Sequence, residues 1–317
     1  MYKDLHRTVL TRLALAWLLL SVGLGAIVFY LEVNPFGGMS GVSSAAANNV
    51  EPGIVRALTL TVVVILATLI VLYPIIILLN KGLFRLSSAL LKSNVELMEV
   101  LGSAIAKRDA DTHVHNYRVT IYAIRLAEEV GLSAHNIRRL MTGAFLHDVG
   151  KIGIADAVLR KPDTLTSEEA AVLRRHVALG VDIIAKSNWL GGAREVVEFH
   201  HEKFDGSGYM KGLKGEAIPL NARIFAIVDV FDALTSRRPY KVPFSFDETR
   251  EIMRRGRGSH FDPRLLDTFY TIAPQLFAQV NGAEDTAVEA ILRGLVNQYF
   301  LSFETLPRTP PRPVAGR

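Results

Sequence analysis

Two stretches without a charged residue constrain this chain more than any other feature of its sequence. Residues 13–31 and residues 57–80 each run without Asp, Glu, Lys or Arg. A helix of either length can cross a hydrocarbon layer of about 30 Å. Half of the 317 residues are hydrophobic, which fits a chain that lies partly in lipid. The sequence therefore predicts two transmembrane helices, at about 13–31 and 57–80, that together form a membrane anchor over residues 1–81.

These two apolar runs have alternative interpretations. The charges that flank them predict how the chain is oriented in the membrane. A buried helix of a soluble domain is one alternative, and a cleaved signal peptide is another for the first run. The small residues 44–47 resemble a cleavage site but lie far beyond that run, so we expect an uncleaved anchor. Basic residues precede the first run and follow the second, which places both chain ends in the cytoplasm. We expect a multi-pass protein of the bacterial inner membrane with a cytoplasmic catalytic part.

Residues 82–106 are expected to form a connecting helix. Apolar residues recur there at spacings of three and four, as in the seam of a two-stranded coiled coil. Ser93 interrupts the seam, and the run is short for a coiled coil. Homodimerisation through this helix and packing against the catalytic domain are both open. The residues of the seam are Leu83, Leu86, Leu90, Leu97, Val100 and Ala104.

The rest of the chain has a helical pattern, so we expect an all-α catalytic domain over residues 107–275. Apolar residues recur at three-to-four spacing, and few runs alternate as strands would. Ser133 and Thr166 are expected to begin helices. Residues 276–317 are expected to add one amphipathic helix and a Pro- and Arg-rich tail. The helical segments are Tyr117–Val130, Ala134–Phe145, Ser167–Lys186, Arg194–His201, Ile218–Leu234 and Asp247–Arg255.

Histidine and aspartate residues in this helical part suggest a metal site. A lone buried histidine is more often a core residue than a ligand. Here, however, four of the candidates form two adjacent pairs, and Asp229 is a carboxylate inside an apolar run that needs a partner. Because the chain has no cysteine, thiolate sites and disulfides are excluded. Such groups on separate helices suit two or three divalent ions, iron or manganese, and phosphoryl displacement. The candidates are His115, His147, Asp148, His176, His200, His201 and Asp229.

Several basic residues near these candidates suit a phosphate-containing substrate. Lys151 lies one turn beyond Asp148, and Arg238 and Lys241 follow the helix of Asp229. Arginine matches phosphate with two hydrogen bonds, and lysine can neutralise a leaving group. Taken singly, each of these residues is more often a solvated surface charge. The net charge of +5 suits anionic lipid or an anionic substrate and does not distinguish them.

Residues 107–265 resemble the HD-GYP domain family of HD phosphohydrolases. The resemblance implies a helical bundle with a metal centre that hydrolyses cyclic di-GMP to linear pGpG or GMP, and no nucleic acid polymer as partner. The matching stretches include His147-Asp148-Val149-Gly150-Lys151, His200-His201-Glu202-Lys203-Phe204-Asp205-Gly206-Ser207-Gly208-Tyr209, Asp229-Val230-Phe231-Asp232-Ala233-Leu234-Thr235, Arg238-Pro239-Tyr240-Lys241 and Gly258-Ser259-His260-Phe261-Asp262-Pro263.

The resemblance also implies a role for individual positions. Lys151 would contact the phosphate and act in catalysis together with Asp148. Tyr209, Asp232, Arg238 and Lys241 would bind the dinucleotide. The metal ligands would be the seven candidates above together with Asp111, which stands four residues before His115 where members with three ions place Glu. A shorter side chain at that position leaves two or three ions open.

One position departs from the family's pattern. The Gly-Tyr-Pro triplet reads Gly208-Tyr209-Met210 here. Proline fixes its backbone φ near −65°, so its loss is expected to weaken the order of this loop. No implied ligand is lost, which favours an active phosphodiesterase. A non-catalytic module that binds cyclic di-GMP or a partner, and an HD hydrolase of another nucleotide, are the alternatives.

Overall fold

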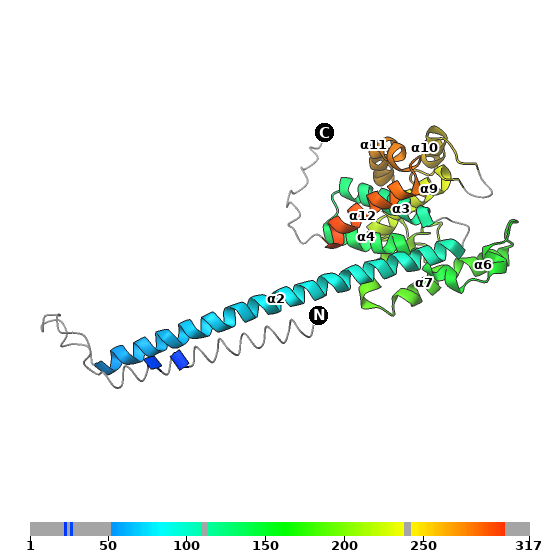
Figure 1. Ribbon diagram of the computed structural model, residues 1–317. Coiled ribbons are helices and arrows are strands. Elements are labelled where there is room, and N and C mark those ends of the chain that lie inside the picture. The colour runs from blue at the N-terminus through cyan, green and yellow to red at the C-terminus, as the bar shows by residue number, and fades with distance from the viewer. Residues whose placement is uncertain (1–21, 24–25, 28–51, 109–112, 238–241, 302–317) are drawn as a thin grey trace. The chain divides into compact units, whose positions relative to one another are not determined.

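The protein is all-α over the residues that the structure describes, as the sequence predicts (Figure 1). The computed structural model describes residues 22–23, 26–27, 52–108, 113–237 and 242–301. In these ranges the one β pairing is an isolated bridge between Arg257 and Phe261. The helices are α2 Pro52–Arg108, α3 His113–Glu129, α4 Ala134–Leu146, η2 Val149–Gly153, α5 Asp156–Leu159, α6 Ser167–Arg174, α7 His176–Ile184, η3 Asn188–Ala193, α8 Arg194–Phe199, η4 Gly215–Ala217, α9 Leu220–Thr235, α10 Phe246–Arg255, α11 Pro263–Val280, α12 Asp285–Val296 and η5 Asn297–Leu301.

Helix α2 carries the second apolar run and continues far beyond it. Among the described residues it is the one helix that is long and apolar enough to cross a membrane, over Leu58–Ile105. Large apolar side chains are exposed on it, such as Ile70 at 64%. The connecting helix expected at 82–106 is a continuation of α2, because a glycine at position 82 is tolerated inside a helix. The other expected span, 13–31, lies outside the described residues except for the helical pairs at 22–23 and 26–27.

The chain divides into two compact units, Met1–Ser88 and Ala89–Arg317. In the second unit one face of α2 packs into the domain core through Val95, Met98 and Ile105. Leu97 and Val100 on another face are 63% and 66% exposed. Core packing of this helix is therefore present. Homodimerisation through its exposed face stays a prediction, which the molar mass of the detergent-solubilised protein would check.

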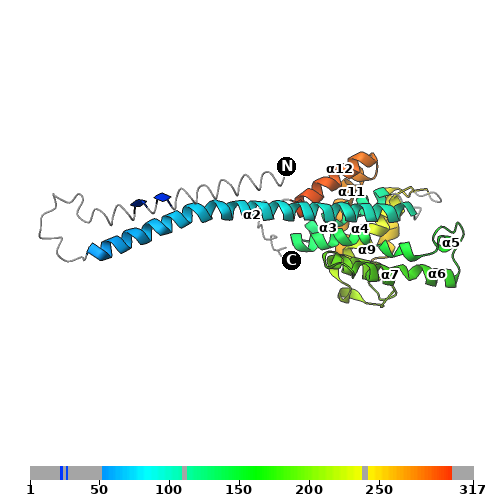
Figure 2. The ribbon, with the colours of Figure 1, turned by 60° about the horizontal axis from the view of Figure 1, so that its bottom comes forward.

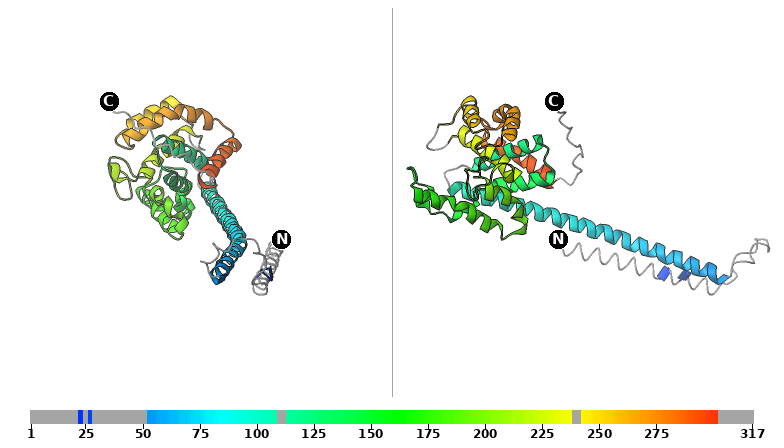
Figure 3. Two further views of the ribbon diagram at one scale, coloured as in Figure 1. Left: turned by 90° about the vertical axis from the view of Figure 1, so that its left-hand side faces the viewer. Right: turned by 180° about the vertical axis from the view of Figure 1, so that it is seen from behind.

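The core of the second unit is built around α3. This helix packs against α4, α9, α11 and α12, and its interior residues from Val119 to Ala127 are almost all buried. Aromatic rings extend the core, since Phe231 on α9 contacts Tyr122 and Phe269 edge-on at centroid distances of 5.4 and 5.0 Å. Figures 2 and 3 show α6 and α7 on one side of this core and α11 and α12 on the other. Because α3 and α9 are fixed at the centre, polar groups on them have defined positions.

Several helix boundaries differ from the sequence expectation. Ser133 and Thr166 are N-caps as predicted, and Thr166 forms a capping box with Glu169. The helix expected over 167–186, however, breaks at Arg175 into α6 and α7. The expected domain end at 275 falls inside α11, whose buried Leu276 and Val280 belong to the core. The second unit therefore includes α11 and α12 in its core.

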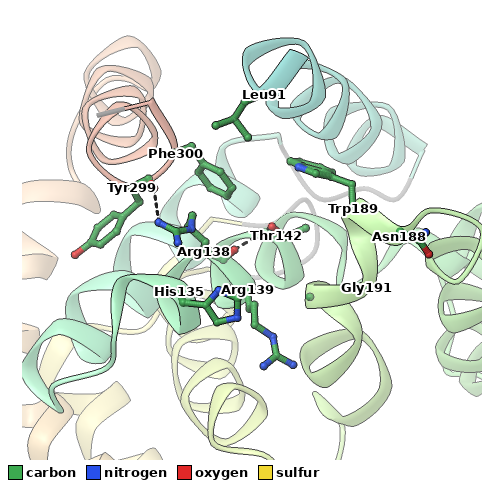
Figure 4. A pocket seen from close by; sticks show the side chains of 11 residues that line it. Leu91, His135, Arg138, Arg139, Thr142, Asn188, Trp189, Gly191, Tyr299 and Phe300 are labelled. Atoms are coloured by element: carbon green, nitrogen blue, oxygen red, sulfur yellow. Dashed lines mark hydrogen bonds between the residues drawn. The ribbon is translucent and has the colours of Figure 1, made fainter. Parts of the chain in front are cut away.

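A cavity of about 750 Å³ lies within this unit, between the buried part of α2, α4, η3 and η5. Figure 4 shows Arg138 and His135 from α4 on one wall and Phe300 facing them. Arg138 donates a hydrogen bond to the carbonyl of Tyr299 at 3.1 Å. The indole of Trp189 lies 6.4 Å from the ring of Phe300. None of the candidate metal ligands lines this cavity.

Candidate metal centre

The predicted ligands other than Asp111 come together in two clusters, within each of which the ligand atoms lie no more than 4.8 Å apart. They come from α3, from the residues after α4 and α8, from the start of α7 and from α9. Asp111 lies outside the described residues. One cluster holds Asp148, His176, His200 and His201, and the other holds His115, His147 and Asp229.

A glycine allows the two segments nearest Asp148 to meet. A Cβ atom on Gly150 would lie 1.8 Å from the carbonyl oxygen of His176 and 2.4 Å from the amide nitrogen of Gly180. No side chain fits in that space. Gly150 therefore lets η2 pack directly on α7, and this packing brings Asp148 beside His176.

Asp148 lies between the two clusters, and its two oxygens face different ligands. Oδ1 lies 3.4 Å from Nε2 of His176 and 4.0 Å from Nε2 of His200. Oδ2 lies 3.0 Å from Nε2 of His147 and 2.7 Å from Nζ of Lys151. A single carboxylate can therefore serve both clusters.

Backbone carbonyls orient three of the histidines. Nδ1 of His147 lies 2.8 Å from the carbonyl of Ala144, and Nδ1 of His176 lies 2.7 Å from that of Leu173. His200 makes the same kind of contact one turn back along its own helix. A carbonyl can only accept, so Nδ1 of each ring carries a proton, and in the neutral rings of His176 and His200 Nε2 keeps its lone pair. This is the tautomer that metal-binding histidines adopt.

His115 is oriented differently, through a buried carboxylate. Its Nδ1 lies 2.7 Å from Oδ2 of Asp232, which is fully buried and also accepts two hydrogen bonds from Arg118. Burial acts to raise the pKa of Asp232, but the hydrogen bonds from His115 and Arg118 outweigh it and lower this pKa to about 2. The expected contact of Asp232 with the dinucleotide stays a prediction, and in this structure both of its oxygens are used by His115 and Arg118. Asp232 thus positions His115.

The electrostatics of the centre favour a cation. Burial lowers the pKa of His176 and His200, and lowers that of His201 to about 3, so all three are neutral at pH 7. Burial also disfavours the charged form of His147, but Asp148, supported by Asp229, outweighs it and raises the pKa of His147 to about 9. Positive charge is therefore stabilised between the two carboxylates.

This set of donors fits divalent metal ions. Nε2 of His176 and Nε2 of His200 lie 3.4 Å apart, and two lone pairs that face each other at this distance need a positive charge between them. Imidazole and carboxylate ligands without thiolate suit borderline and hard divalent ions. The two clusters fit two ions, and a third depends on the position of Asp111.

Tyr209, expected to bind nucleotide, lies against the centre. Its ring stacks on His201 at a centroid distance of 4.6 Å, and the guanidinium of Arg174 lies 5.2 Å from the ring centroid. Burial raises the pKa of Tyr209 to about 12, so its hydroxyl stays protonated at neutral pH. Arg238 and Lys241, the other expected contacts of the dinucleotide, lie outside the described residues.

Glu202 holds the loop in which Met210 replaces the family's proline. The buried carboxylate of Glu202 accepts hydrogen bonds from the backbone amides of Lys211, Gly212 and Leu213, at 2.6, 3.1 and 3.1 Å. A Cβ atom on Gly208 would lie 2.4 Å from the amide nitrogen of Lys203, so only glycine fits there. The weaker order of this loop that we expect from Met210 stays a prediction. The hydrogen bonds to Glu202 hold the loop without a proline.

Sequence reasoning missed Arg118, Arg174 and Glu202. Arg118 lies one turn after His115 and so faces the same side of α3, which is a signal that helical spacing offers. Glu202 directly follows the His-His pair, and its burial could not be read from its type. Arg174 precedes the break between α6 and α7, which the sequence did not indicate.

Comparisons with known proteins agree with this site. The HD domain family model matches residues 99–265. The chain is 42% identical over 194 residues to the cyclic di-GMP phosphodiesterase response regulator RpfG of Xanthomonas campestris, covering 61% of this chain and 51% of that protein. It is 40% identical over 178 residues to 3'3'-cGAMP-specific phosphodiesterase 2 of Vibrio cholerae, covering 56% and 34%. A probable cyclic di-GMP phosphodiesterase of the same species is 39% identical over 235 residues, covering 68% and 53%.

Each of these three relatives is longer than the matched part, and the chain spans about half or less of their length. A crystal structure of the cyclic GMP-AMP-specific phosphodiesterase V-cGAP3 of Vibrio cholerae has the same fold, with a TM-score of 0.51 and 20% identity over 65% of this chain and 54% of that chain. The family model covers more than half of the present sequence. The chain therefore belongs to the HD domain family, in its HD-GYP branch.

Proposed function

We propose that the chain is a metal-dependent phosphodiesterase of cyclic dinucleotides. The observation that carries the proposal is Asp148, whose Oδ1 and Oδ2 face different clusters while Lys151 contacts the same carboxylate. Two bound divalent ions, iron or manganese, would supply Lewis-acid stabilisation of phosphoryl oxygens and would lower the pKa of water. Relatives at about 40% identity that carry cyclic dinucleotide phosphodiesterase names support this function.

The residues of the chain have distinct roles in this proposal. Lys151, whose side chain is 16% exposed and 2.7 Å from Asp148, donates to a phosphate oxygen or to the leaving oxygen. Tyr209 keeps its proton and offers a hydroxyl donor or a stacking ring to a guanine. Arg238 and Lys241 neutralise phosphate charge on the dinucleotide. We propose cyclic di-GMP as the substrate and linear pGpG or GMP as the product, with 3'3'-cGAMP as the second candidate because three relatives carry that name.

The purified full chain is expected to hydrolyse cyclic di-GMP with iron or manganese bound, because each of the two clusters combines carboxylate with imidazole, a ligand set that suits these ions. The measurement combines elemental analysis with chromatography of the products from cyclic di-GMP, 3'3'-cGAMP and a simple activated phosphodiester. Chelation followed by re-addition of each metal assigns the activity to the ion.

Two outcomes would contradict the proposal. A metal-loaded chain that binds cyclic di-GMP and releases neither pGpG nor GMP is a binding module rather than an enzyme. A chain that hydrolyses only the simple phosphodiester or another nucleotide is an HD hydrolase of a different substrate class. Faster turnover of 3'3'-cGAMP than of cyclic di-GMP would support the proposed phosphodiesterase reaction and would make 3'3'-cGAMP the preferred substrate.

We also propose that the chain is anchored in the bacterial inner membrane with residues 82–317 in the cytoplasm. The exposed apolar surface of α2 supports an anchor, and the basic residues outside both apolar runs support this orientation. A phosphatase reporter that is active only in the periplasm should be inactive when fused after Arg317. A fusion within residues 32–56 should be active, and the reverse pattern would contradict the topology.

A further inference from the structure

Arg108, the last residue of α2, binds the segment that follows Asp148. Its Nη1 donates to the carbonyls of Lys151, at 3.0 Å, and of Ile152. Its Nη2 donates to the carbonyl of Ile154 at 2.6 Å, and its Nε donates to Oδ1 of Asp156 at 3.1 Å. One guanidinium therefore holds four acceptors within six consecutive residues.

The segment that Arg108 binds is held by the buried side chain of Ile154 and by the packing of η2 on α7, but its middle is open to solvent. Ile152 is 54% exposed, and Gly153 is exposed as well, so apolar burial does not fix these residues. Around its exposed middle the backbone closes short turns, from the amide of Lys151 to the carbonyl of Asp148 and from the amide of Ile154 to the carbonyl of Lys151. An exposed segment with few buried contacts opens easily. The bonds from Arg108 are what tie it to a long helix.

The same segment carries the lysine of the centre. The carbonyl of Lys151 is bound by Arg108, while its ammonium lies 2.7 Å from Oδ2 of Asp148. A shift of the backbone at Lys151 would move the ammonium away from this carboxylate. Arg108 touches neither cluster, so its effect on the centre passes through Lys151.

We propose that Arg108 is a positioning residue that sets where the Lys151 ammonium stands at the metal centre. This inference rests on the proposed function, in which Lys151 donates to the phosphate. The residue type matters, because a guanidinium is a planar fork with five donors and can bind several carbonyls at once. A lysine at the same position has one ammonium on a flexible stem and cannot hold three carbonyls and a carboxylate together.

The test compares Arg108→Ala and Arg108→Lys with the matched control Lys107→Ala in the full chain. Lys107 is the preceding residue on α2 and is exposed. We expect both Arg108 variants to lose about ten- to a hundred-fold in kcat, the usual effect of removing a group that orients a metal-site residue. The KM and the metal content should stay within about two-fold of the wild type, and Lys107→Ala should behave as the wild type.

Hydrogen–deuterium exchange separates this inference from the proposed function. In both Arg108 variants the amides of Lys151 and Ile154 should exchange faster, while α3 and α9 keep their protection. This readout holds even if the wild-type chain turns over no cyclic dinucleotide, which would overturn the function alone. Full rescue by Arg108→Lys, unchanged exchange at Lys151, or a loss of metal together with protection across the whole domain would overturn the positioning role.

Discussion

Replacing Asp148 with Asn is expected to release most of the bound metal and to lower kcat by at least about a thousand-fold. Its two oxygens face different clusters, with Oδ1 3.4 Å from Nε2 of His176 and Oδ2 3.0 Å from Nε2 of His147. An amide keeps the shape but replaces one oxygen with a donor that cannot bind a cation. Metal ions contribute several kcal/mol of charge stabilisation, and each ~1.4 kcal/mol is about tenfold in rate. Elemental analysis and turnover of cyclic di-GMP measure the two effects.

Asp182→Asn is the matched control for this substitution. Asp182 lies on α7 and is 70% exposed, with Oδ2 3.3 Å from Nζ of Lys186. The Asp182→Asn substitution makes the same chemical change outside the centre, so the metal content and the rate should stay as in the wild type. Full metal content and a wild-type rate in Asp148→Asn would show that the shared carboxylate is a structural group.

Asp232→Ala is expected to destabilise the domain by about 3–5 kcal/mol, the usual cost of removing one partner of a buried ion pair. The substitution leaves the guanidinium of Arg118, which is 14% exposed, without the carboxylate that it contacts twice. It also frees Nδ1 of His115, so the cluster of His115 should bind its ion more weakly. Calorimetry should show the unfolding temperature lower by roughly 6–20 °C.

The control for Asp232 is an aspartate with the same kind of partner on the surface. Asp267 accepts two hydrogen bonds from Arg257, at 2.9 and 2.6 Å, but its side chain is 53% exposed. Because exposed ion pairs contribute little to stability, Asp267→Ala should leave the unfolding temperature and the metal content almost unchanged. Equal losses in both variants would contradict the argument from burial.

The candidate ligands of the centre could be predicted because their residue types and spacing alone indicate metal-binding chemistry. Adjacent His147-Asp148 and His200-His201 pairs in a helical chain without cysteine leave few other uses for these groups. The structure brings them together with His176 and Asp229 in the two clusters. Their metal-binding role itself stays a prediction until metal is measured.

The side chains that orient His115 and the Lys151 backbone could not be predicted, because each acts across a long separation in sequence. The resemblance implied a contact of Asp232 with the nucleotide, but it gave no sign that Asp232 binds Arg118 and His115, more than a hundred residues earlier in the sequence. Arg108 contacts backbone carbonyls, which every residue carries, so the sequence does not indicate which of them it binds. Such contacts follow from the packing of helices and not from local spacing.

Proline and glycine lie inside two helices whose bounds differ from the sequence expectation. Helix α11 was missed, and it contains Pro274 inside an otherwise regular run with Pro263 at its start. Helix α2 contains Pro74 and Gly82 and yet runs unbroken from Pro52 to Arg108. Burial on neighbouring helices can offset the cost of such residues, whereas propensity alone predicts a break.

Trp189, beside the cavity at α4, gives the second unit its own fluorescence signal. Trp189 lies in that wall, half-buried and close to Phe300, and the other of the chain's two tryptophans is Trp17 in the first apolar run. A chain with Trp17→Phe therefore has a single indole, and its fluorescence comes from the domain alone. Emission that shifts to longer wavelength reports water reaching Trp189, so folding of the domain can be followed in detergent or lipid without a label.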